Sequence, residues 1–89
     1  MMTEYAKTKA VEALHALDGK DTQTHQILTH LFAIGPLTPL DAWVRYGCYR
    51  LGARIKDLRN MGVPIVTRTI KKGGKRYAEY RLEDDDEQI

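Results

Sequence analysis

This sequence is short of the residues that build cross-linked or membrane-spanning proteins. Only one of its 89 residues is a cysteine, Cys48, so no internal disulfide can form. No apolar run approaches the roughly 20 residues needed to span a bilayer, and the N-terminus lacks the apolar stretch of a signal peptide. We therefore expect neither a secreted disulfide scaffold nor a membrane protein, and we expect the chain in the cytoplasm.

Residues for catalysis or metal binding are equally scarce. The three histidines, at positions 15, 25 and 30, lack cysteine partners and zinc-ligand spacing, and we interpret them as surface or partly buried side chains. Gly73 and Gly74 lie between two expected strands, whereas a phosphate-binding loop leads from a strand into a helix. We expect Cys48 to be a small buried filler. The sequence thus predicts no enzymatic activity, no cofactor and no metal site.

What the chain does have is a strong segregation of charge, which the formal net charge of +2 hides. Residues 45–81 contain eleven Lys/Arg and only two acids, Asp57 and Glu79. Residues 1–44 carry three bases and five acids, and residues 82–89 carry five acids and no base. A contiguous basic half is typical of a protein with a polyanionic partner. We favour nucleic acid over the alternative of an ordinary solvated face.

A short helix is expected directly after Thr38. The hydroxyl of Thr38 can accept a backbone N–H that the first helical turn leaves unpaired, and Pro39 suits the first helical position. Gly47 can adopt the left-handed conformation that ends a helix. Three apolar residues at helical spacing give this helix one apolar side: Leu40, Trp43 and Val44.

A second helix over residues 50–60 follows the turn at Gly47. Leu51, Ile55 and Leu58 recur at helical spacing and predict its buried stripe, and Gly62 lies just past its end. Two short helices, a glycine-containing turn and a basic second helix together indicate a helix-turn-helix.

Two further helices are expected before this motif. Residues 3–18 carry a shallow, alanine-rich stripe that can pack on the domain, pair with a second copy, or fray: Ala6, Ala10, Ala13, Leu14 and Leu17. The next helix is capped by Thr22 or Thr24 and ends at Gly35, with a core stripe of Ile27, Leu28 and Leu31. Pro36 and Leu37 are expected to be extended and to leave room for one short edge strand.

A β-hairpin is expected after Gly62. Residues 63–70 are dominated by β-branched side chains, residues 77–82 form a second run of this kind, and Gly73-Gly74 supplies the turn. A lone hairpin is marginally stable in water, so we expect one face, with Ile65, Tyr80 and Leu82, to lie on the helices. The resulting division is an N-terminal helix (1–20) for packing or dimerisation, a domain (21–82) and a disordered acidic tail (83–89).

The wording of the sequence resembles a family of small helix-turn-helix proteins of tailed bacteriophages and prophages. The resemblance rests on TQTHQIL (22–28), LTPLDA (37–42), YRL (49–51), ARI (53–55), LR (58–59), GVPI (62–65) and GKRYAEYRL (74–82). It implies an α+β winged helix, a three-helix core plus a hairpin wing, here with an extra N-terminal helix, in a bacterial host cell. The turn around Cys48 is about one residue longer than in compact repressors, so repressor base-contact positions do not transfer.

Helical geometry provides candidates for reading DNA bases. With the Leu51/Ile55/Leu58 stripe inward, the residues pointing most directly outward are Ala53, Lys56 and Asn60. In a major groove, a lysine can meet guanine acceptors and an asparagine the polar atoms of adenine. Asp57 beside them would be repelled by phosphates unless it contacts cytosine or pairs with a neighbour such as Arg54. Ordinary solvent exposure is the competing interpretation.

A second group of residues is expected to contact the DNA backbone, where charge matters more than geometry. These candidates are Arg45, Arg50 and Arg59 on the helices and Lys71, Lys72, Lys75 and Arg76 at the hairpin tip. Arg54 lies nearer the buried edge, and we favour a structural pair with a carboxylate such as Asp41. Trp43, Tyr77 and Tyr80 are interpreted as core and cross-strand residues rather than base-stacking platforms.

The sequence thus predicts a non-enzymatic, sequence-specific protein that binds double-stranded DNA, as a transcriptional regulator or an accessory factor in recombination or replication. The alternative is a winged-helix module that binds a host or phage protein through its basic half. A homodimer through the N-terminal helix and a protein partner for the acidic tail are further expectations.

Overall fold

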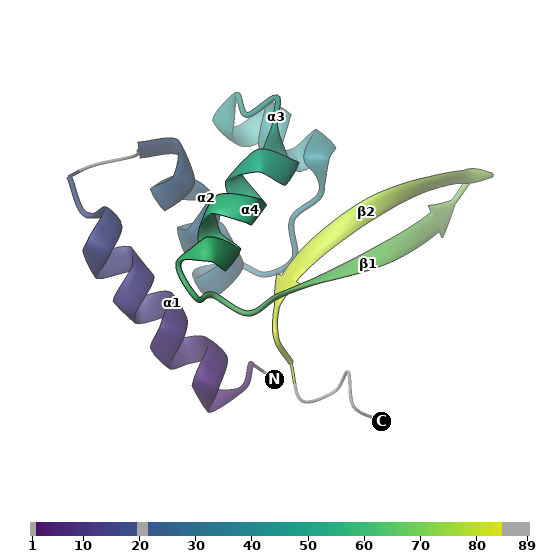
Figure 1. Cartoon of the computed structure of the whole chain (residues 1–89). Helices are drawn as coiled ribbons and strands as arrows, with labels where there is room; N and C mark the ends of the chain where they lie inside the picture. The colour runs from purple at the N-terminus through teal and green to yellow at the C-terminus, as the bar shows by residue number, and fades with distance from the viewer. Residues whose placement is uncertain (1, 20–21, 85–89) are drawn as a thin grey trace.

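The computed structural model describes residues 2–19 and 22–84, which form four helices followed by an antiparallel hairpin. The elements are α1 (Glu4–Leu17), α2 (Thr22–Ala33), α3 (Pro39–Tyr46), α4 (Leu51–Asn60), β1 (Ile65–Lys72) and β2 (Lys75–Leu82). The hairpin extends from one side of the helices, and α1 lies on the opposite side (Figure 1). The predicted α+β architecture with an additional N-terminal helix is confirmed. In the described residues, no helix is long and apolar enough to cross a membrane.

The centre of the core is α2, which contacts α1, α3, α4 and β2. Its predicted stripe of Ile27, Leu28 and Leu31 is fully buried. Burial of such aliphatic side chains contributes roughly 1.5–3 kcal/mol each, so this helix organises the fold around it.

The alanine-rich stripe of α1 packs on α2. Of the three expected alternatives, the structure shows packing on the domain rather than fraying or pairing with a second copy. Ala6, Ala10 and Ala13 are buried and Leu17 nearly so. Because alanine has a single methyl group, the two helices can approach closely along this stripe. Thr3 caps α1, with its hydroxyl oxygen accepting the N–H of Ala6 at 3.0 Å.

The two ends of the described chain are tied together, which corrects the expectation that the acidic tail is disordered from residue 83. The N–H of Thr3 donates to the Glu83 carbonyl oxygen at 3.1 Å, and the Thr3 hydroxyl donates to Glu83 Oε1 at 3.0 Å. Met2 and Asp84 form a β-bridge. Backbone pairing needs no apolar side chain, and a carboxylate is favoured near the N-terminus of a helix. Residues 85–89 of the expected tail lie outside the described residues.

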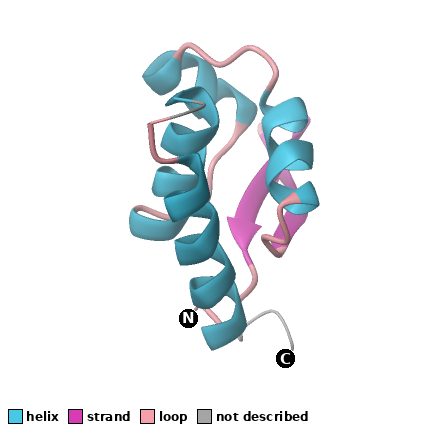
Figure 2. Ribbon diagram, turned by 60° about the vertical axis from the view of Figure 1, so that its left-hand side comes forward, coloured by secondary structure: helices cyan, strands magenta, loops and turns pink. Residues whose placement is uncertain are grey.

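These contacts bring the start of α1 to the base of the hairpin, because the Glu83 N–H also donates to the Pro64 carbonyl oxygen at 3.0 Å. In Figure 2, α1 comes to the front. We call residues 2–3, 64 and 83–84 the terminal clasp.

His30 is a core residue, which corrects its interpretation as a surface or partly buried histidine. It is 3% exposed. Its Nε2 lies 3.2 Å from the Pro36 carbonyl oxygen and its Nδ1 lies 2.7 Å from the Tyr46 hydroxyl. The Pro36 carbonyl oxygen can only accept, so Nε2–H donates to it, and Nδ1 shares a hydrogen bond with the Tyr46 hydroxyl. The histidine therefore joins α2, α3 and the segment between them. Its helical position was visible in the sequence, but its partners were not.

The hairpin pairs Ile65 with Leu82 at its base and Lys72 with Lys75 at its tip. Gly73 and Gly74 have φ of 58° and 76°, as a two-residue turn between twisted strands requires. The inward face is as predicted, with Ile65 and Leu82 buried and Tyr80 partly buried against the core. The strands are two residues longer at the turn than the sequence pattern indicated.

The short edge strand expected around Leu37 is a single bridge. The N–H groups of Leu37 and Tyr80 each donate to the other residue's carbonyl oxygen, at 2.8 and 2.9 Å. Buried Leu37 thereby links the start of the helix-turn-helix to β2.

Candidate nucleic-acid interface

The start of α3 and the turn between α3 and α4 have the predicted geometry. The Thr38 hydroxyl oxygen accepts the N–H of Asp41 at 3.2 Å, and Pro39 occupies the first helical position. Gly47 ends α3 with a φ of 64°, a conformation that costs glycine little and other residues more. Cys48 in the turn is 1% exposed, so its prediction as a buried filler is confirmed.

The orientation of α4 agrees in large part with the sequence analysis. Its predicted stripe of Leu51, Ile55 and Leu58 is buried. Lys56 and Asn60 are exposed, whereas Ala53 is half-buried and so less available than expected. Of the three base-reading candidates, α4 therefore exposes one cation and one amide.

Arg59 joins α4 to the hairpin. Its guanidinium donates to the Ile65 carbonyl oxygen, at 2.8 Å from Nη2 and 3.2 Å from Nε, and to the Thr67 hydroxyl at 2.8 Å. These three hydrogen bonds hold β1 beside α4, and the expected contact of Arg59 with a phosphate stays a prediction. Successive helical residues turn by 100°, so Lys56 lies about 60° from Arg59, on the same side of α4 as the hairpin.

The carboxylate of Asp57 is neutralised within α4. Arg54 Nη2 lies 3.2 Å from Asp57 Oδ2, so Arg54 pairs here rather than with Asp41, the partner we had favoured. Asp57 lies about 160° around the helix from Arg59, on the side away from the hairpin. The other acid of the basic half, Glu79, pairs with Arg81 at 3.1 Å. Both acids of residues 45–81 are therefore engaged with arginines.

The hairpin tip brings four cations together in pairs. Lys71 lies directly opposite Arg76, and Lys72 directly opposite Lys75. All four are exposed. Like charges directly opposite one another destabilise a hairpin, by an amount comparable to the roughly 0.2–1 kcal/mol that a favourable cross-strand pair contributes. The two successive like-charge pairs therefore lower the stability of the hairpin at its tip.

The pairs at the tip divide between the two faces of the hairpin. Side chains two residues apart in a strand share a face, so Lys71 and Arg76 lie on the face of Thr67, which contacts α4 through Arg59. Lys72 and Lys75 lie on the other face. The tip thus carries two cations on each face of the hairpin, at the end of strands of eight residues (Figure 1).

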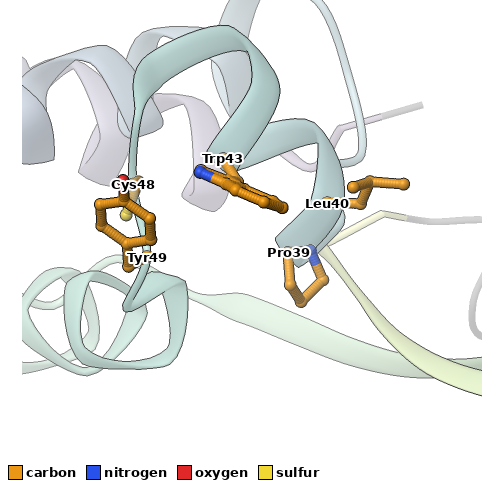
Figure 3. A pocket seen from close by; sticks show the side chains of 5 residues that line it. All are labelled: Pro39, Leu40, Trp43, Cys48 and Tyr49. Atoms are coloured by element: carbon orange, nitrogen blue, oxygen red, sulfur yellow. The ribbon is translucent and has the colours of Figure 1, made fainter.

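The aromatic residues of this region differ in how they match the expectation. Trp43, interpreted as a core or cross-strand residue, is 53% exposed, which corrects that interpretation. Tyr77 is 38% exposed and pairs with Ile70 across the hairpin, as expected of a cross-strand residue. Tyr49, which no sequence pattern distinguished, is 82% exposed, and its ring centroid lies 6.0 Å from that of Trp43. The two rings line a hollow of about 470 Å³ together with Pro39, Leu40 and Cys48. Figure 3 shows these five side chains.

The reason for this error is that α3 has two apolar faces. Ala42 is fully buried and Tyr46 is partly buried against the core. The predicted apolar side, Leu40, Trp43 and Val44, faces solvent. Apolar residues at helical spacing identify a face, but the spacing does not say which face the core takes.

Comparison with known proteins supports this assembly of helices and hairpin. The family model of the winged helix-turn-helix domain matches residues 22–85. Comparisons with curated proteins and with solved structures find no significant match. The matched region covers most of the chain and includes α2, α3, α4 and both strands. This chain therefore belongs to the winged helix-turn-helix domain family.

Proposed function

We propose that this protein binds duplex DNA, with the exposed surface of α4 in the major groove and the hairpin tip on the backbone. A winged helix-turn-helix domain indicates DNA binding in general. The observation that carries the finer proposal is the pair of like-charge cross-strand pairs at the tip, Lys71–Arg76 and Lys72–Lys75. Phosphates that lie between such cations turn an unfavourable contact into a favourable one.

The two parts of the proposed interface do different work. Lys56 and Asn60 on α4 are the candidates for reading base edges, because lysine suits guanine acceptors and asparagine suits adenine. The tip cations and Arg50, exposed at the N-cap of α4, are candidates for backbone contacts, which position the protein without reading sequence. Half-buried Ala53 allows close approach but offers no polar group for readout.

Support for the placement of α4 comes from its fixed relation to the hairpin. Arg59 holds the base of β1 against the helix, and this contact supports the proposal that Lys56 on α4 and the cations at the tip act on the same DNA. The only acid of α4, Asp57, is paired with Arg54 on the far side. We further propose that the protein acts in the cytoplasm of a bacterial host as a phage-type transcriptional regulator or as an accessory factor in recombination or replication.

A selection from random duplexes, followed by affinity measurements across salt concentrations, tests the proposal. We expect an enriched sequence motif and an affinity that falls steeply with salt, because each neutralised phosphate releases counterions. Lys56→Ala and Asn60→Ala should each reduce discrimination between the selected site and scrambled DNA by about 1–3 kcal/mol. Arg50→Ala, the matched control, should lower both affinities together. Absence of salt-dependent binding to any duplex would contradict the proposal.

A further inference from the structure

The outer face of α3 is an unpartnered apolar surface. Leu40 is 64% exposed and Val44 is 74% exposed, with half-exposed Trp43 beside them. Apolar side chains at positions i, i+3 and i+4 of a helix form a continuous stripe. Scattered exposed apolar residues are normal on a protein surface, whereas a contiguous group marks an interaction site.

Two charged residues border this stripe on the side away from Trp43. Asp41 and Arg45 are both exposed, one helical turn apart. Within the described part of the chain, neither makes an ion pair. An acid and a base separated by one turn form a pattern that is complementary to itself when the helix is reversed.

We propose that this face is a self-association surface on which α3 packs antiparallel to α3 of a second copy. A two-fold axis near residues 42 and 43 places Leu40 beside the partner's Val44. The same axis brings Asp41 within reach of the partner's Arg45, and symmetry generates each contact twice. Trp43 and Tyr49 then lie at one border of the contact and the two ion pairs at the other. An isologous interface requires this kind of self-complementary surface.

The charge pattern distinguishes a second copy from other occupants. A surface for stacking nucleobases would gain nothing from Asp41, which repels phosphate. The alanine stripe of α1 is buried on α2 and is therefore not available to a second copy. The proposal assigns Arg45 to the ion pair rather than to a phosphate, and it does not depend on DNA binding.

A charge-swap series measured by sedimentation velocity without DNA tests the proposal. An interface built on one eight-residue helix is small and therefore weak, so we use protein from about 1 μM to 1 mM. Asp41→Arg and Arg45→Asp should each weaken self-association at least about tenfold, because each places like charges together twice. The double variant should regain it. A mixture of the two single variants should form the mixed dimer, since each introduced charge then meets its opposite.

Two further measurements complete the test. Val44→Glu should abolish self-association, whereas Val11→Glu, at an exposed valine of α1, should leave it unchanged. Trp43 is the only tryptophan, so its emission should shift to shorter wavelength as the protein concentration rises. A monomer at all concentrations would overturn the proposal, as would loss of association in Val11→Glu alone or no recovery in the double variant. Quenching of Trp43 only when single-stranded oligonucleotide is added would overturn it in favour of base stacking.

Discussion

The base and the tip of the hairpin are built from the same two strands, but they contribute differently to the protein. At the base, Ile65 and Leu82 are buried, Leu37 pairs with Tyr80, and Arg59 donates to the Ile65 carbonyl oxygen. At the tip, two pairs of like charges face each other and no described core residue supports them. Strand pairing alone therefore does not indicate what a strand contributes. The base stabilises the fold, and the tip sacrifices some stability for what we propose is phosphate binding.

The largest loss of stability should come from Leu82→Ala at the base of the hairpin. Leu82 is 4% exposed, and removal of a buried leucine side chain typically costs about 2–5 kcal/mol of the free energy of unfolding. Urea denaturation followed by circular dichroism measures it. Leu40→Ala, at a leucine exposed in the single copy, is the matched control and should cost well under 1 kcal/mol when measured at about 1 μM protein, at the low end of the range used for self-association. Equal losses in both variants would remove the distinction between buried and exposed leucines.

The terminal clasp should show the next effect. A chain that ends at Leu82 loses the hydrogen bonds of Glu83 to Thr3 and Pro64 and should unfold with a free energy lower by about 2–3 kcal/mol. A chain that ends at Asp84 keeps them and should retain full stability, as the same denaturation experiment can measure. If both truncations are equally stable, the clasp does not contribute to the fold.

The chain that ends at Asp84 also tests the role of the acids at residues 85–87, because it lacks them. We propose that these acids compete with phosphates for the basic surface. Affinity for random duplex DNA should therefore rise in the truncated chain at low salt, and the gain should fade near physiological ionic strength, where the Debye length is about 8 Å. Fluorescence anisotropy measures both conditions. Unchanged affinity at low salt would leave the acids without a role in DNA binding.

Arg59 tests the contrast between the base and the tip of the hairpin. It lies in the basic half of the sequence, but its hydrogen bonds stabilise the base. Arg59→Ala should lower the free energy of unfolding by about 1 kcal/mol, since it leaves the Ile65 carbonyl and the Thr67 hydroxyl without their donor. Exposed Arg50 is the control, and Arg50→Ala should leave stability nearly unchanged while weakening DNA binding. Weaker DNA binding in Arg59→Ala with no loss of stability would return Arg59 to the phosphate contacts we first expected.

The smallest change in stability should come from the tip, and it should be an increase. Lys72→Glu replaces a like-charge pair with an attractive one opposite Lys75, so stability should rise by about 0.2–1 kcal/mol. DNA affinity should fall across all sequences, and the slope of affinity against salt should become less steep. Thermal unfolding and anisotropy together test this. A variant that is less stable, or one that binds DNA as tightly as before, would contradict our account of the tip.

Local patterns in the sequence determined the elements of this protein. The Thr38 side chain caps the start of α3, and Gly47 ends the helix in a left-handed conformation. Gly73-Gly74 makes the hairpin turn through the same conformational freedom of glycine. These effects operate within a few residues, so they can be read without the rest of the chain. The buried stripes of α2 and α4 were equally legible, because both helices have a single strongly apolar face.

Tertiary structure alone decided which groups meet. The outward direction of Trp43 depends on α2 accepting Ala42, the burial of His30 depends on Tyr46 and Pro36, and the order at Glu83 depends on Thr3, 80 residues away. Arg54 and Arg59 look alike in the sequence, yet one pairs with Asp57 and the other holds β1. Partners of polar and ambiguous apolar side chains are chosen by packing between distant segments, and helical or strand periodicity carries no information about that choice.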